Sequence, residues 1–364
     1  MLLKRSQIFL IGLAFLSVAG GARAQPAPVS PGVPTTPAVR SDQAELPKSA
    51  PTAIAAAPVT GATAKRSPPD VGEYDPTNRA APTLPPLLPS TTGTRALLWE
   101  VKSIDGLNTA FLFGTIHVGK SSFYPLPDGV EKAFQRSAKL VVEANITDQK
   151  DAAEIALLMD YPKGETIEKH LPPPLLARLK TQLVKHKIPF ANVATMRSVM
   201  LGGLLPIVEF VQLGYEINQG LDLKLTQRAL AEKKPIVELE SSLLQIKLLT
   251  GMSTPLQEAF LENAIVMSEQ GHTSDQVTGI VNAWQLGDAK LLVEISDEAA
   301  RSGRLVRELN AILLDQRHPA MLGKIEGYIA SGLTHFVAVG ALHLVGKDGL
   351  IELLKARGYS VRQL

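Results

Sequence analysis

The sequence has 364 residues, no cysteine and a formal net charge of +2. The absence of cysteine excludes disulfide bonds, thiolate metal sites and a cysteine nucleophile, so the fold must depend on its hydrophobic core. A nearly neutral charge without a marked basic run argues against nucleic acid as a partner.

The N-terminus has the three parts of a secretory signal peptide. Lys4 and Arg5 precede an apolar stretch at 8–19, and the tripeptide at 22–24 has the small-residue pattern of a cleavage site. The stretch is shorter than the roughly 20 residues that a membrane-spanning helix needs. We therefore expect residues 1–24 to be a signal peptide, and an uncleaved anchor is the alternative. The mature chain should have no transmembrane helix and should be periplasmic or secreted.

Residues 25–92 are rich in Pro, Ala, Thr and Ser, and hold more than half of the 26 prolines of the chain. Such a segment cannot bury enough apolar surface to offset the entropy lost on ordering. We expect a disordered linker here, followed by one folded region at 93–364.

The folded region alternates between predicted strands and helices. Strands are expected at 97–102, 109–113, 139–143, 235–239, 335–339 and 359–362, and helices at 127–136, 151–159, 175–186, 199–213, 221–232, 349–357 and in several segments from 255 to 329. The segments 111–143 and 336–362 share one plan of strand, Gly-x-x-His, helix and strand. This pattern predicts an α/β fold, with a mixed sheet built from two similar halves and a central helical insertion.

Two histidines and two carboxylates follow apolar strands. His117 ends the motif 114–117, His343 ends the motif 340–343, and Glu143 and Glu240 close the strands before them. The carboxyl ends of strands are where open α/β sheets place their ligand sites. The alternative is that the two histidines only cap strand ends in a packed core.

Two histidines and a carboxylate are a common ligand set for a catalytic divalent metal. We expect His117, His343 and one of the two carboxylates, Glu143 or Glu240, to bind such a metal, with the remaining carboxylate acting as a general base or orienting a histidine. A His–Glu pair that activates water without a metal is the alternative. Arg317 is expected either to clamp a carboxylate or to form a surface ion pair, and Asp222 to cap a helix.

The first histidine motif overlaps a second pattern. Residues 114–121 match the phosphate-binding sequence Gly-x-x-x-x-Gly-Lys-Ser. That loop needs a helix beginning at Lys120, but Pro125 and Pro127 stand where its second turn would be. We therefore expect the match to be coincidental. The other histidines are expected to be exposed or, for His335 at the start of a strand, structural; the expected exposed ones are His170, His186, His272 and His318.

These motifs together resemble the TraB/GumN family, which is related to the Tiki proteases. The resemblance extends from Leu98 to Leu364 and rests on the segments 112–117, 124–127, 142–143, 220–222, 239–240 with Gln245, 340–346 and 358–359. It implies an α/β fold shared with erythromycin esterases and haem-binding ChaN-like proteins. Its Tiki branch implies a protease dependent on manganese or cobalt that uses His117, His343 and Glu143.

Two positions depart from the family pattern. Asn145 stands where the family often has Asp, and His318 stands where it often has Asn, and each change is expected to bear on the ligand shell. The resulting prediction is an exported metal-dependent hydrolase, in particular a peptidase, with Mn, Co or Zn and a peptide or small-molecule substrate. Glu143, Glu240 and Arg317 are its predicted catalytic residues. The alternatives are a metal-free esterase-like hydrolase and a non-enzymatic binding or assembly factor related to polysaccharide or haem.

Overall fold

The computed structural model describes residues 95–300 and 304–364. The predicted signal peptide and linker, at 1–24 and 25–92, lie outside the described residues. The strands are β1 (Leu98–Lys102), β2 (Thr109–Thr115), β3 (Lys139–Val142), β4 (Ile236–Glu238), β5 (His335–Gly340) and β6 (Ser360–Gln363). The helices are α2 (Asp128–Arg136), α3 (Ala152–Met159), α4 (Pro173–Lys185), α5 (Ser198–Gln212), α6 (Leu221–Ala231), α7 (Ser242–Thr250), α8 (Thr254–Gln270), α9 (His272–Gln285), α10 (Ala289–Ala300), α11 (Arg304–Asn310), α12 (His318–Ala330), α13 (Ala341–Leu344) and α14 (Leu350–Ala356).

The strands form one mixed sheet in the order β4-β3-β5-β2-β1-β6. β4, β3, β5 and β2 pair in parallel, whereas β1 is antiparallel to both of its neighbours. β2 and β5 pair with Thr115 opposite Gly340, so the strands that lead into the two histidine motifs are direct neighbours. Parallel strands end at the same edge of a sheet, and four consecutive carboxyl ends therefore meet at one edge.

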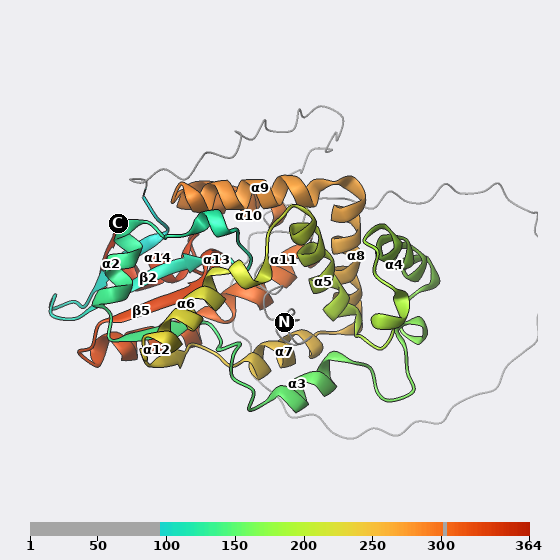
Figure 1. The fold of residues 1–364 in the computed structure, drawn as a ribbon, viewed down its shortest axis with the longest axis horizontal. Coiled ribbons are helices and arrows are strands. Elements are labelled where there is room, and N and C mark those ends of the chain that lie inside the picture. The colour runs from blue at the N-terminus through green and yellow to red at the C-terminus, as the bar shows by residue number, and fades with distance from the viewer. Residues whose placement is uncertain (1–94, 301–303) are drawn as a thin grey trace, which may run out of the picture. The chain divides into compact units, whose positions relative to one another are not determined.

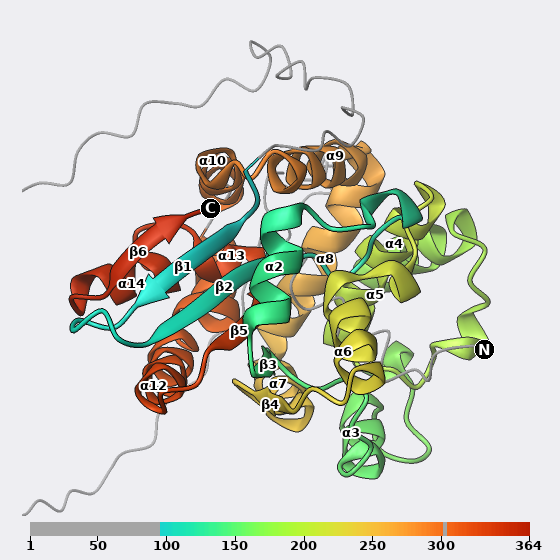
Figure 2. The same ribbon diagram turned by 60° about the vertical axis from the view of Figure 1, so that its left-hand side comes forward.

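The centre of the sheet is buried on both faces. Residues 111–113 of β2, 140–142 of β3 and 336–339 of β5 are all buried, which is typical of parallel strands covered on both sides. Figure 2 shows α2 in front of the sheet, and α12 and α14, which contact one another, behind it. Continuous apolar runs in the sequence thus become the central strands, as predicted.

The central insertion is helical and lies mainly to one side of the sheet. Figure 1 shows α3, α4, α5, α7 and α8 gathered there, with α9 running along the top. β4 interrupts the insertion and adds the outermost parallel strand. None of the helices in the described residues is both long and apolar enough to span a bilayer.

Both halves of the predicted plan are present, but their histidine motifs differ in conformation. After β2 the chain continues through His117 as an irregular loop, whereas after β5 the helix α13 begins at once and carries His343. The strands that close the two halves also pair differently, since β3 joins β5 and β6 joins β1. The two histidines therefore reach the same edge of the sheet by different local routes.

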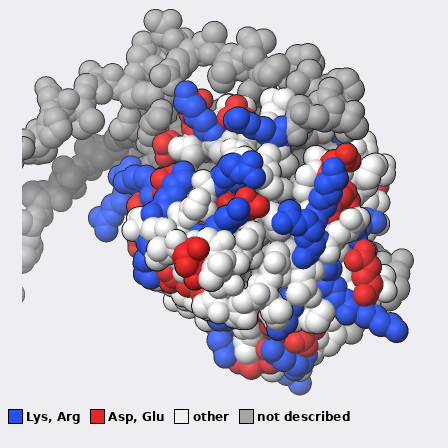
Figure 3. Space-filling view, turned by 90° about the vertical axis from the view of Figure 1, so that its left-hand side faces the viewer, with Lys and Arg blue, Asp and Glu red and all other residues white. Residues whose placement is uncertain are grey.

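Basic and acidic side chains are interspersed on the surface in Figure 3. Charged side chains of both signs are thus mixed on this face, in keeping with the nearly neutral net charge. No broad field of one sign covers the part of the chain that is drawn there as described.

Candidate functional site

The four side chains predicted from strand ends lie at four adjacent strands. His117 follows β2, His343 follows β5, Glu143 follows β3, and Glu240 follows β4. All four are between 1% and 7% exposed. Buried imidazoles and carboxylates are unfavourable unless they have polar partners, so their partners define the site.

His117 is held by the carboxylate of Asp222, a residue that was expected to cap a helix. Its Nδ1 donates to Oδ2 of Asp222 at 2.6 Å, and the other oxygen of Asp222 accepts from Thr115 Oγ1 at 2.5 Å. Gly220, not Asp222, occupies the N-cap of α6, and the expected capping by Asp222 is wrong. An Asp in the first turn of a helix has an ordinary local explanation, and only the fold shows that its partner is His117.

Two loops meet closely enough behind His117 that only glycine fits between them. A Cβ on Gly220 would lie 2.2 Å from the His117 carbonyl oxygen, and a Cβ on Gly119 would lie 2.2 Å from the carbonyl oxygen of Gln219. The amide of Leu221 donates to the Ile116 carbonyl at 3.0 Å across the same contact. This close packing delivers Asp222 to the ring of His117.

We expect Gly220→Ala to lower the free energy of unfolding by at least about 2 kcal/mol, because the new methyl group meets backbone that cannot yield. Gly323→Ala is the matched control, since nothing lies within 4 Å of its Cβ position in the middle of α12. That change should stabilise by about 0.5–1 kcal/mol through helix propensity. Chemical denaturation of both variants checks the prediction, and equal effects would contradict it.

Arg317 joins the two carboxylates of the site. Its Nη2 donates to Glu143 Oε1 at 2.5 Å and to Glu240 Oε2 at 2.6 Å, and its Nε donates to Glu240 at 3.1 Å. Gln245 donates to Glu143 Oε1 at 2.8 Å, and the amide of Gly340 donates to Glu143 Oε2 at 3.2 Å. Arg317 is therefore a buried clamp on two carboxylates, which is the first of its two predicted roles.

The clamp sets the charge state of Glu143. Burial raises the pKa of this carboxyl, but the Arg317 guanidinium outweighs burial and holds the pKa well below its ordinary value. Glu143 is thus an anion at neutral pH. Two carboxylates and one guanidinium leave this part of the site with a formal charge of −1, which favours a cation or a protonated imidazole nearby.

His343 completes the set through a second histidine. His343 Nε2 lies 3.7 Å from Glu143 Oε1, and its Nδ1 lies 3.0 Å from Nε2 of His318. His318 and His186 were expected at the surface, and both expectations are wrong, because helix packing buries them. His186 contacts Gln212 and Ser268 between α4, α5 and α8 and takes no part in the site.

The other departure from the family pattern does not reach the two histidine motifs through its side chain. The side-chain Oδ1 of Asn145 accepts from the backbone amide and the hydroxyl of Thr147 in a local turn. The backbone amide of Asn145 donates to the carboxylate of Glu238. His335 opens β5, and its Nδ1 donates to the carbonyl oxygen of Leu333 at 2.8 Å, in agreement with its expected structural role.

The phosphate-loop match has no helix to support it. Lys120 is extended, and only the short 3-10 turn Ser121–Phe123 follows it before α2 begins at Asp128. The amide of Gly119 donates to the carbonyl of Glu216 at 3.0 Å, so it does not point to a ligand. The expectation that the match is coincidental is in line with this geometry.

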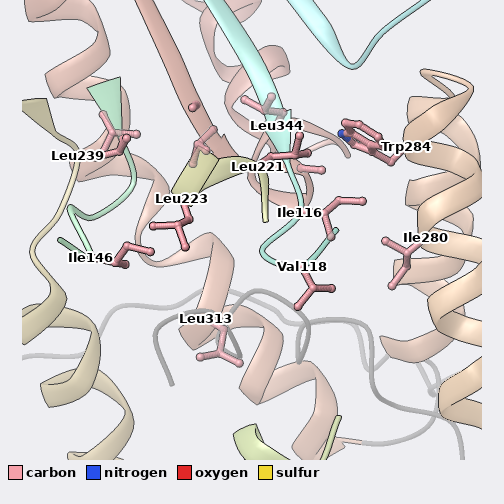
Figure 4. Close-up of a cluster of buried hydrophobic side chains, with 14 of the residues drawn as sticks. Ile116, Val118, Ile146, Leu221, Leu223, Leu239, Ile280, Trp284, Leu313 and Leu344 are labelled. Carbon is pink, nitrogen blue, oxygen red and sulfur yellow. The ribbon is translucent and has the colours of Figure 1, made fainter. Parts of the chain in front are cut away.

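A small cavity lies between the two histidine motifs. Its volume is about 20 Å³, room for about one water molecule. Thr115, His117, Gly340 and His343 line it together with apolar side chains. Figure 4 shows the surrounding apolar cluster, in which Trp284 donates to the Gly114 carbonyl at 2.8 Å and so ties α9 to the end of β2.

The charge of His117 depends on Asp222. Burial lowers the pKa of His117, but the Asp222 carboxylate outweighs it, and the pKa lies above its ordinary value of 6.5. A raised folded-state pKa contributes stability that is fully present below about pH 6.5 and is lost as the pH rises through the folded-state pKa.

Asp222→Asn should therefore lower the pKa of His117 and destabilise the metal-free protein more below pH 6.5 than well above it. NMR titration of His117 and denaturation at several pH values measure the two effects. Asp275→Asn, an exposed change in the first turn of α9, is the control and should leave both unchanged. A pH-independent deficit in Asp222→Asn would show that Asp222 acts only through packing.

Comparisons with known proteins place this geometry in context. Residues 97–363 match the model of the TraB/PrgY/gumN family. "Uncharacterized protein YbaP" of Escherichia coli (strain K12) is 24% identical over 244 residues, which cover 67% of this chain and 87% of that protein. "Metalloprotease TIKI homolog" of Amphimedon queenslandica is 23% identical over 335 residues, covering 76% of this chain and 65% of that protein.

A shorter match has higher identity. "Metalloprotease TIKI2" of Danio rerio is 34% identical over 105 residues, which cover 28% of this chain and 20% of that protein. This chain thus spans less than two thirds of the length of these two metalloproteases. No solved structure matches it significantly. The family match covers all four strand ends and the residues that hold them.

Proposed function

This chain belongs to the TraB/PrgY/gumN family, as its motifs predict, and on that premise we propose that it is a metal-dependent hydrolase of peptides. His117, Glu143 and His343 are the proposed ligands. The single observation that carries the proposal is the strand order β4-β3-β5-β2, which brings two buried imidazoles and two buried carboxylates to one edge of the sheet. The metalloprotease relatives support the reaction class.

The donor set suits a divalent ion by its chemistry. Among residues 95–300 and 304–364, no group of three or more His, Asp and Glu side chains is already spaced as a metal site. However, His343 Nε2 and Glu143 Oε1 are 3.7 Å apart, and His117 interacts electrostatically with Glu143. A metal ligand histidine commonly donates its other ring N–H to a carboxylate, as His117 does to Asp222.

When bound, a divalent metal lowers the pKa of a water molecule toward ~7 and polarises a carbonyl group. The side chains of this chain prepare that chemistry. Asp222 orients His117, while Arg317 and Gln245 hold Glu143 as an anion beside His343. Glu240 accepts from the same Nη2 of Arg317 as Glu143 does, and it balances the guanidinium charge.

One observation favours a second candidate within the hydrolases. The His117–Asp222 pair at 2.6 Å has the geometry of a general base and the carboxylate that orients it. Such a pair activates water or a hydroxyl group without a metal. The candidate is a metal-free esterase, and it differs from the first in its response to chelators.

The test is hydrolysis of peptide and ester panels by the exported full chain, before and after exhaustive chelation. We expect peptide cleavage that disappears with chelation and returns with Mn²⁺, Co²⁺ or Zn²⁺. Ester cleavage that survives chelation would select the metal-free candidate. Failure to cleave either panel with any of the three ions would overturn the proposal.

We further propose that the chain is exported, with residues 1–24 removed and 25–92 serving as a linker. The charged start, the apolar stretch and the small residues at 22–24 support this. The mass of the protein recovered from the periplasm or medium should match a chain that begins at Gln25. Recovery of the uncleaved chain from the membrane fraction would contradict it.

A further inference from the structure

His318 lies between the backbone of one loop and the second histidine motif. It is the first residue of α12 and is buried. Its Nδ1 is 2.7 Å from the carbonyl oxygen of Asp348, and its Nε2 is 3.0 Å from Nδ1 of His343. The two rings are nearly perpendicular, at 77°, with centroids 5.2 Å apart. Both nitrogens of His318 therefore have a partner within hydrogen-bond distance.

The chemistry of the partners assigns each proton in this chain of hydrogen bonds. A carbonyl oxygen only accepts, so Nδ1 of His318 must carry the hydrogen and donate it. A neutral imidazole has one N–H, which leaves Nε2 of His318 as an acceptor. Nδ1 of His343 must then donate to it, and the proton of His343 is on Nδ1. His318 is buried and its two partners are a carbonyl oxygen and an imidazole rather than a carboxylate, which favours the neutral ring.

The tautomer of His343 decides what its other nitrogen can bind. When His343 is neutral and its proton is on Nδ1, Nε2 carries a lone pair 3.7 Å from the Glu143 carboxylate. A lone pair and a carboxylate oxygen do not bond to one another, but both bind a cation between them. With the proton on Nε2 instead, His343 would donate toward Glu143 and would not ligate a metal through that nitrogen.

We propose that His318 is a positioning residue. Its Nδ1 donates to the Asp348 carbonyl and its Nε2 accepts from Nδ1 of His343, which holds His343 with its Nε2 lone pair toward Glu143. Asp222 has the corresponding effect on His117, where a carboxylate accepts directly from Nδ1. This inference rests on the proposed function in one respect: the proposed function identifies the cation between His343 and Glu143 as a divalent metal ion. In this chain an imidazole thus fills the position where the family often has Asn.

The experiment is imidazole nitrogen NMR of the full chain, metal-free and at mildly alkaline pH, followed by titration with Zn²⁺. His318→Gln retains an acceptor oxygen close to the position of Nε2, whereas His318→Leu retains volume but no acceptor. His335→Gln changes a buried histidine outside the site and is the matched control. His343→Gln identifies the signals of His343 by their loss.

We expect the Nδ1–H tautomer for His343 in the parent, in His318→Gln and in His335→Gln. In His318→Leu we expect a shift toward the Nε2–H tautomer and a Zn²⁺ affinity lower by roughly 10–100-fold, the usual range for loss of a residue that orients a ligand. Restoration by His318→Gln to within about 3-fold of the parent would separate positioning from packing.

Two results would overturn the inference: an Nε2–H tautomer of His343 in the parent, or a tautomer and Zn²⁺ affinity unchanged in His318→Leu. Its failure is distinguishable from failure of the proposed function. If the parent has the Nδ1–H tautomer but binds no Zn²⁺, Mn²⁺ or Co²⁺, positioning by His318 stands and the metal-dependent function falls. If the parent binds metal with His343 as Nε2–H, the function stands and the inference falls.

Discussion

Arg317→Met is expected to lower the free energy of unfolding by about 3–5 kcal/mol at neutral pH, the usual result of breaking a buried ion pair on one side. The guanidinium is 7% exposed and donates to both Glu143 and Glu240. Methionine fills much of the same space but leaves two buried carboxylates without their cation. Urea denaturation of metal-free protein measures the effect.

The pH dependence of this loss identifies its cause. Burial raises the pKa of Glu143, but in the parent Arg317 outweighs burial and lowers the pKa well below 4.5. A lowered folded-state pKa contributes stability that is present above about pH 4.5 and lost as the pH falls through the folded-state value. The deficit of Arg317→Met should therefore be complete at neutral pH and shrink on acidification below about pH 4.5.

Arg178→Met is the matched control. Arg178 also contacts two carboxylates, those of Glu262 and Glu269, but its side chain is 32% exposed. Surface ion pairs contribute ~0–1 kcal/mol, so this change should have a small effect with little dependence on pH. If the two variants lose the same stability, or if the Arg317→Met deficit is constant with pH, the clamp has no special electrostatic role.

The strands and their polar ends could be predicted because each depends on a local pattern. Continuous apolar runs before His117, Glu143 and His343 are recognisable in the sequence. The structure places Glu143 directly after β3, His117 in the loop after β2, and His343 in α13, which follows β5. Their neighbourhood could not be derived in this way. β5 begins nearly two hundred residues after β3 ends, and its insertion between β3 and β2 is decided by tertiary packing.

Asp222 and His318 were misjudged for one physical reason. Each stands in the first turn of a helix, where a polar side chain has a sufficient local explanation as a cap or as a solvated group. Their real partners, His117 and the pair His343 and Asp348, lie on other elements. Local reasoning counts only neighbours in sequence, and it therefore underestimates polar residues that the fold buries.

For Arg317 the sequence indicated the role but not the partners. A carboxylate clamp was one of its two expected roles, but the number of carboxylates and their identity follow only from the adjacency of β3 and β4. That adjacency brings Glu143 and Glu240 to one guanidinium. The residue type therefore indicated the chemistry, while the sheet order supplied the partners.

His117→Gln and His343→Gln are each expected to weaken binding of the divalent ion by about 100-fold or more, beyond the 10–100-fold typical of residues that only orient a ligand. Each change removes one proposed ligand nitrogen but retains a polar side chain of similar reach. Metal-dependent peptide hydrolysis should fall at least as far. Metal content of the purified variants, titration with Mn²⁺ and Zn²⁺, and turnover with excess metal measure the three effects.

His335→Gln controls for the loss of a buried histidine, because His335 opens the same strand that leads to His343 but bonds to Leu333 and stacks on Tyr328 instead of contacting the site. It should bind metal as the parent does. Near-UV circular dichroism should show that all three variants keep their tertiary packing, so that weaker binding reports on ligands. If either His117→Gln or His343→Gln binds metal with parental affinity, that histidine is not a ligand. A metal-free parent that still hydrolyses substrate would then point to the His117–Asp222 pair as the base.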